Sequence, residues 1–90
     1  NKDGKNDYLI IEGIYYFPEN TVQIFNQWGN LVWKTNRYGI TGNVFDGHTN
    51  TGLMTNGQDL LPFGTYYYVI NFVNLEGIQI QKTGYLHLTH

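Results

Sequence analysis

The sequence contains no cysteine, no serine and no alanine among its 90 residues. Without cysteine there can be no disulfide framework, no thiolate metal ligand and no cysteine nucleophile. Without serine a Ser-His-Asp triad is impossible. Alanine has the highest helix propensity, so its absence disfavours a bundle of helices.

Charge and long apolar runs are also scarce. Five Lys and Arg residues stand against seven Asp and Glu residues, and the net charge of −2 offers no basic field for nucleic-acid phosphates. No stretch approaches the ~20 consecutive apolar residues of a membrane span, and the first residues lack the pattern of a signal peptide. We therefore expect neither nucleic-acid binding nor a membrane-spanning segment. We expect 90 residues to make a single domain, and from the abrupt polar start at Asn1 we expect that it was cut from a larger protein.

Aromatic residues make up 17% of the chain and hydrophobic residues 41%, which excludes a disordered charged tail. The remainder is rich in Gly, Asn and Thr, which is typical of strands joined by tight turns. We predict strands at residues 8–12, 21–26, 31–35, 44–47, 66–73, 78–81 and 85–89. About seven short strands, with Gly84 marking a bulge in the last part, predict an all-β, immunoglobulin-like antiparallel β-sandwich.

Three segments match the ordered motifs of one protein family. Residues 1–7 read N-x-D-G-x-N-D, residues 22–32 read V-x-I-F-N-x-W-G-x-x-V, and residues 61–70 read L-P-x-G-T-Y-Y-Y-V-I. The short motifs Phe45-Asp46-Gly47 and Gly84-Tyr85-Leu86 occur in the expected order. Over essentially all 90 residues the chain resembles the gliding motility-associated C-terminal domain, which is also called the type B sorting domain of the type IX secretion system.

The resemblance implies a secretion signal and no enzymatic activity. Such domains lie at the C-terminus of very large surface adhesins and of some secreted enzymes in gliding Gram-negative bacteria. They direct the attached protein from the periplasm across the outer membrane to the cell surface or the medium. The implied partners are an outer-membrane protein of the PorP/SprF type and the secretion machinery itself.

A partner of this kind would be bound through exposed aromatic residues and a sheet edge. Exposed Tyr and Trp bury a large area at a low entropy cost. The last predicted strand is expected at a sheet edge, where free backbone groups allow a partner to add a strand. The predicted partner-binding residues are Tyr67, Tyr85, Leu86, His87, Leu88 and Trp28. Large aromatic residues also fill small cores, and we expect Trp33, Tyr66 and Tyr68 inside.

A carbohydrate- or calcium-binding module of a cell-surface adhesin is the alternative function. Aromatic faces can stack on sugar rings, and Asn1, Asp3 and Asp7 surround Gly4 in a pattern that partly matches a calcium loop. Calcium takes six to eight oxygen ligands, whereas an Asx-rich turn explains the same residues without a metal. We therefore expect no firm metal site and no cofactor.

The histidines and remaining carboxylates do not form a recognisable catalytic or metal motif. His48, His87 and His90 lack a short ligand spacing. Asp46 with His48, and Asp59 as a second carboxylate, would need a cleft and close positioning for acid–base chemistry. We expect no catalytic residues.

Overall fold

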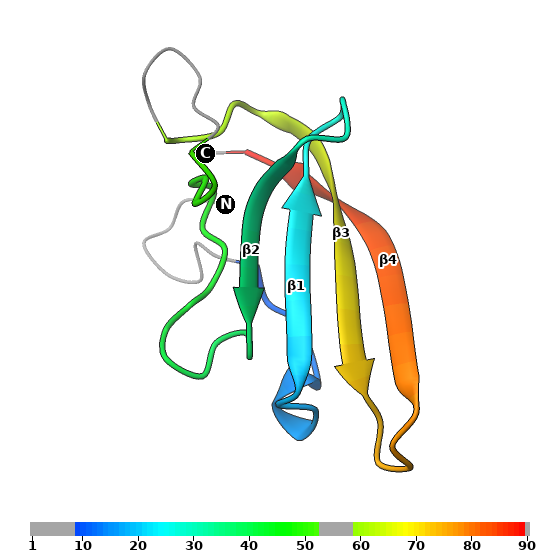
Figure 1. The fold of residues 1–90 in the computed structure, drawn as a ribbon. Coiled ribbons are helices and arrows are strands. Elements are labelled where there is room, and N and C mark those ends of the chain that lie inside the picture. Colours follow the sequence, from blue (N-terminus) through cyan, green and yellow to red (C-terminus); the bar gives the residue numbers. More distant parts are fainter. Residues whose placement is uncertain (1–8, 53–58, 90) are drawn as a thin grey trace.

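The fold is an antiparallel sheet covered on one side by irregular chain (Figure 1). The structure is a computed structural model that describes residues 9–52 and 59–89. Its elements are a short 3-10 helix, η1 (Ile14–Tyr16), and four strands: β1 (Asn20–Phe25), β2 (Leu31–Asn36), β3 (Gly64–Val73) and β4 (Gln79–Leu88). All neighbouring strands are antiparallel, in the order β2-β1-β3-β4.

The all-β class and the strands predicted at 21–26, 31–35 and 66–73 are confirmed. The predicted strands at 8–12 and 44–47 are wrong, because residues 9–12 and 44–47 are irregular and residue 8 lies outside the described residues. One backbone bond, from Leu9 N to Phe45 O at 2.8 Å, joins these two segments, where a strand pair would form a ladder. The described residues thus form four strands in one sheet, and a seven-strand immunoglobulin-like sandwich is not confirmed.

The expected bulge at Gly84 is also wrong. β3 and β4 pair from Gly64↔Leu88 to Val73↔Gln79 without a shift of register, so the strands predicted at 78–81 and 85–89 are one. Gly84 lies opposite Tyr68, and a Cβ atom on Gly84 would lie 2.5 Å from Cζ of that tyrosine. Glycine at this position therefore makes room for the ring of its cross-strand neighbour.

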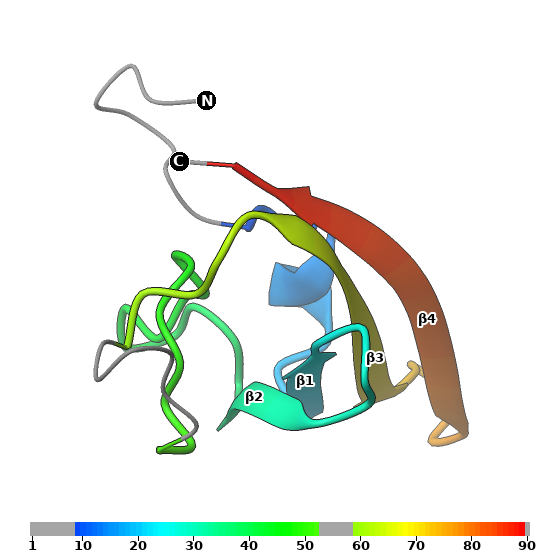
Figure 2. The ribbon, with the colours of Figure 1, turned by 90° about the horizontal axis from the view of Figure 1, so that it is seen from above.

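One face of the sheet forms the core. Side chains alternate along β1, whereas the register shift between β1 and β2 leaves adjacent Val32 and Trp33 both buried. The most buried side chains of this face are between 0% and 7% exposed: Val22, Ile24, Trp33, Tyr66 and Ile70. The prediction that Trp33 and Tyr66 are buried is confirmed, while Tyr68 is half-buried against the core. Figure 2 shows η1 and the irregular segments gathered on the concave side of the sheet, which leaves the convex face open.

Side chains satisfy the backbone of this irregular layer. The hydroxyl of Tyr38 donates to Leu9 O at 2.5 Å and accepts a bond from Phe45 N at 3.0 Å. Asn20, which is 5% exposed, donates from Nδ2 to Phe17 O at 2.7 Å and accepts at Oδ1 from Tyr38 N at 3.0 Å. These bonds replace the ladder that a second sheet would provide.

Tyr66 fixes the entry into β3. Its hydroxyl donates to Pro62 O at 2.8 Å, four residues upstream, which is the geometry of the tyrosine corner found in immunoglobulin-type sandwiches. Burial raises the pKa of Tyr66 above its usual value, because the ionised phenolate is disfavoured away from water.

The buried amide of Asn20 gives the first prediction. Asn20→Ala leaves Phe17 O and Tyr38 N without these partners, and we expect a loss of roughly 2–4 kcal/mol in the free energy of unfolding, measured by urea denaturation. The matched control is Asn71→Ala, because Asn71 bonds Gln81 on the open face, where water can replace the lost partner. Equal losses from the two variants would contradict this assignment.

Tyr66 gives a pH-dependent prediction. Since its pKa is raised in the folded state, the unfolded chain ionises first, and the stability that Tyr66 provides is complete below about pH 10 and declines as pH rises further. In Tyr66→Phe we expect a loss of about 1 kcal/mol at pH 7 and a shallower decline at alkaline pH. Denaturation series from pH 7 to 11 measure both, and an unchanged alkaline slope would show that Tyr66 is not responsible.

Candidate partner-binding surface

The predicted partner-binding residues are concentrated on β4, which lies at an edge of the sheet as expected. Alternation along β4 separates the four predicted residues of this strand into two pairs. Tyr85 and His87 are exposed on the convex face. Leu86 and Leu88 are half-buried on the concave face and pack against the core. β4 therefore presents polar and aromatic groups on one side and anchors itself with leucines on the other.

An aromatic row crosses the convex face and ends at β4. Phe25, Tyr67 and Tyr85 are direct cross-strand neighbours on β1, β3 and β4. The ring centroids of Phe25 and Tyr67 lie 5.0 Å apart in a stacked arrangement, and those of Tyr67 and Tyr85 lie 6.3 Å apart edge to face. Tyr67 is half-buried between its neighbours, whereas Tyr85 is 79% exposed. The row thus presents Tyr85 on a rigid support beside the sheet edge.

Phe25 belongs to this surface but was not predicted as a binding residue. The sequence does contain a signal for it, because the alternation that buries Val22 and Ile24 places Gln23 and Phe25 on the opposite face. His87 extends the surface next to the row, with Nδ1 3.4 Å from Oγ1 of Thr65.

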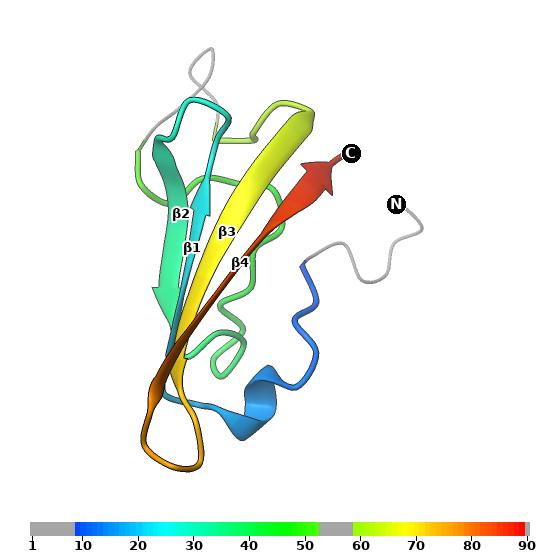
Figure 3. The same ribbon diagram turned by 90° about the vertical axis from the view of Figure 1, so that its right-hand side faces the viewer.

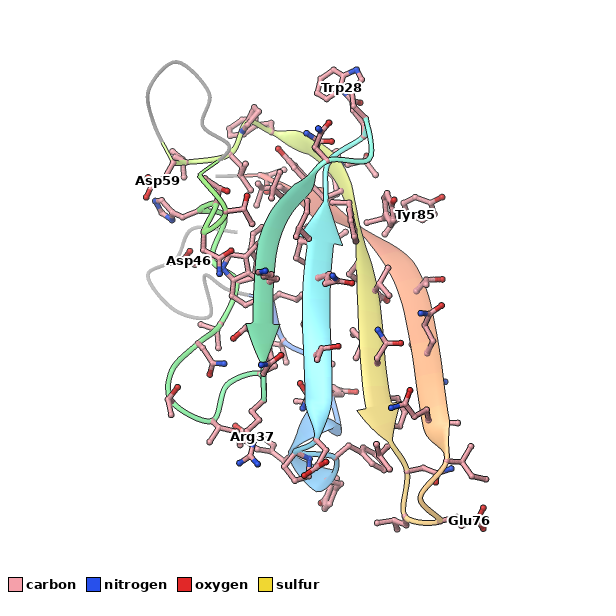
Figure 4. All side chains as sticks on the ribbon, in the orientation of Figure 1. Trp28, Arg37, Asp46, Asp59, Glu76 and Tyr85 are labelled. Atoms are coloured by element: carbon pink, nitrogen blue, oxygen red, sulfur yellow. The ribbon has the colours of Figure 1, made fainter. Side chains whose placement is uncertain are left out.

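Trp28 is exposed but separate from the row. It lies in the turn between β1 and β2, where Oδ1 of Asn26 accepts bonds from Trp28 N at 3.0 Å and Asn30 N at 2.9 Å. Gly29 has φ +82°, a conformation that favours glycine in this turn. In Figure 4 Trp28 projects beyond the end of β1, whereas Tyr85 lies beside β4. Trp28 is 75% exposed at this end of the sheet.

The sheet has very little charge. None of the four strands contains Asp or Glu, and their only Lys and Arg residues are Lys34 and Lys82. Lys34 lies opposite Gln23 and is exposed on the convex face. The convex face is otherwise made of Thr, Asn, Gln, Val and aromatic side chains.

The other candidate sites do not come together in the described residues. Nδ1 of His48 lies 3.0 Å from Oδ1 of Asp46, and the two side chains are 46% and 53% exposed. A side-chain hydrogen bond exposed to this extent contributes little to stability, at most about 1 kcal/mol. Residues 9–52 and 59–89 contain no cluster of three or more His, Asp or Glu side chains placed to hold a metal ion. The candidate calcium ligands Asn1, Asp3 and Asp7, and also His90, lie outside the described residues.

Comparisons with known proteins agree with the motifs in the sequence. In the part of the chain that the structure describes, no helix is long and apolar enough to cross a membrane. No curated protein and no solved structure matches the chain. The family model of the CHU_C type IX secretion signal domain matches residues 1–88. This match covers nearly the whole sequence and confirms the family expected from the three motifs. The chain belongs to the CHU_C family of type IX secretion signal domains.

Proposed function

We propose that this domain directs an attached cargo protein across the outer membrane by binding an outer-membrane protein of the PorP/SprF type. Membership of the family of type IX secretion signal domains supports the secretion role. The cargo is a large surface adhesin or another secreted protein, and its destination is the cell surface or the medium.

The observation that carries the binding role is the rigid aromatic row that ends at an open sheet edge. Tyr85 is 79% exposed, yet its ring contacts Tyr67, which is itself stacked on Phe25. A supported aromatic side chain loses little freedom on binding, and such residues dominate the energy of protein interfaces. His87 adds a polar group on the same face of the same strand. The mechanism is therefore recognition of the folded domain, with no covalent step assigned to its side chains.

Export of a reporter tests the secretion role. A fluorescent protein with a periplasmic signal peptide is fused to the N-terminus of this domain and produced in a gliding bacterium with a type IX system. We expect the reporter at the surface or in the medium only when the PorP/SprF-type protein is present. The reporter without the domain serves as the control and should stay in the periplasm. Folded fusion protein that also stays in the periplasm would contradict the proposal.

Charged substitutions on β4 test the binding surface. In the double variant Tyr85→Lys, His87→Lys we expect capture by the purified PorP/SprF-type protein to fall by about tenfold or more, because a central aromatic contact is lost. The matched control is Thr21→Lys, Gln23→Lys, which places the same charges two residues apart on β1, on the same face of the sheet. The variant on β4 should retain the thermal unfolding midpoint to within a few degrees, since both side chains lie outside the core. The control places a lysine at position 23 opposite Lys34, so its midpoint should fall somewhat further, and capture is compared at a temperature at which both variants are folded. Equal capture of the two variants would show that the contact lies elsewhere.

A further inference from the structure

We propose that β4 binds its partner by accepting an extended strand at its open edge, and that this strand carries an acidic side chain beside Lys82. The inference rests on the proposed function and specifies the chemistry of the partner. Three observations support it: the two edges of the sheet differ, β4 is paired regularly along its whole length, and β4 carries one lysine and no acidic residue.

The edge formed by β2 is already occupied. The side chain of Asn50 makes the two backbone hydrogen bonds that a neighbouring strand would make. Its Oδ1 accepts from Lys34 N at 3.0 Å, and its Nδ2 donates to Lys34 O at 2.7 Å. Its backbone N also donates to Val32 O at 3.1 Å. Thr51 adds a bond from Oγ1 to Leu31 O at 2.9 Å. A partner strand therefore has no free ladder to join on this side.

Among residues 9–52 and 59–89, no strand pairs with the outer edge of β4. Figure 3 shows β4 running along the near side of the sheet with no described segment in front of it. All ten residues pair with β3 in one continuous register, so the backbone groups of every second residue point away from the sheet. Edge strands are usually shielded by a bulge, a proline, a short length or a charged side chain. Of these β4 has only the charged side chain of Lys82, so a strand that joins this edge has to accommodate that charge. An extended strand is the ligand whose donors and acceptors repeat with the same spacing.

The side chains of β4 define what the added strand should carry. On the concave side, Leu86 and Leu88 are only half-buried, so apolar residues beside them would complete their burial. On the convex side, a neighbouring residue would contact Tyr85, which extends the aromatic row by one strand. The partner strand should thus alternate, with apolar residues beside Leu86 and Leu88 on the concave side. Lys82 lies opposite Ile70 on this same side, nearer the start of β4, so the acidic residue is expected at that end of the added strand.

The charge of Lys82 distinguishes between two possible occupants of the β4 edge, a strand of a partner protein and the β4 strand of a second copy of this chain. Lys82 is exposed, and no side chain of the described residues forms a salt bridge with it. Because β4 has no Asp or Glu, a second β4 strand supplies no opposite charge and brings another Lys82 close to the first. A carboxylate on a different protein provides the complementary charge. The occupant is therefore an acidic, alternating strand of the outer-membrane partner.

Amide hydrogen exchange tests whether a partner strand pairs with the outer edge of β4. It is measured on the domain alone and on the domain bound to the purified PorP/SprF-type protein. In the free domain, we expect the amides of β4 that face away from β3 to exchange rapidly. In the complex they should become protected, while the amides of β2 stay unchanged. A complex in which β4 gains no protection overturns this inference and leaves the proposed function standing. Failure to form any complex overturns both, and a concentration-dependent dimer of the free domain with a protected β4 identifies a second copy as the occupant.

Reversing the charge of Lys82 tests whether the partner strand carries an acidic side chain beside it. Lys82→Glu should weaken binding at least about fivefold, because an attraction becomes a repulsion, and Lys82→Gln should weaken it less. The matched control is Lys34→Glu, since Lys34 is the other lysine of the sheet and lies on the occupied edge. The affinity of the Lys34→Glu variant for the PorP/SprF-type protein should be unchanged. Equal weakening in both reversals would mean that only net charge matters and would overturn the assignment to Lys82.

Discussion

The whole structure depends on satisfying the backbone hydrogen bonds of irregular chain that is packed on an apolar sheet. A buried donor or acceptor without a partner costs about 1–3 kcal/mol, and the covering layer lacks the ladder of a second sheet. Side chains provide the missing partners. Asn20 and Tyr38 join the layer at one end, and Thr49 donates from Oγ1 to Val32 O at the other. This requirement accounts for the buried Asn20, Tyr38 and Thr49.

The same arrangement makes the two sides of the sheet unequal. The irregular layer covers the concave face, and Asn50 closes the edge of β2. The convex face and the edge of β4 remain, and they carry the aromatic row from Phe25 to Tyr85. The described residues therefore offer one exposed region in which aromatic area and the outer edge of β4 lie together, which is the surface proposed for partner binding.

The candidate site could be predicted only in part. Exposure of Tyr85 and Trp28 followed from residue type and position, and the edge position of the last strand followed from its place in the chain. Two features depended on pairing. Phe25 joins the site because the register of β1 with β3 places it against Tyr67, and Gly84 continues β4 because it accommodates the ring of Tyr68. Tyr67 is far from Phe25 in the sequence, and Tyr68 is far from Gly84, so local patterns do not reveal either contact.

The sequence by itself determined the all-β class, the positions of the main strands and the family, because these depend on local alternation, turn residues and motifs that a linear chain displays directly. Only the tertiary structure decided which apolar segments become strands. Residues 9–11 and 44–45 are as apolar as many strands, but a strand exists only where a second segment completes its hydrogen bonds. Here the hydroxyl of Tyr38 takes part of that role, so the second layer is irregular in the described residues.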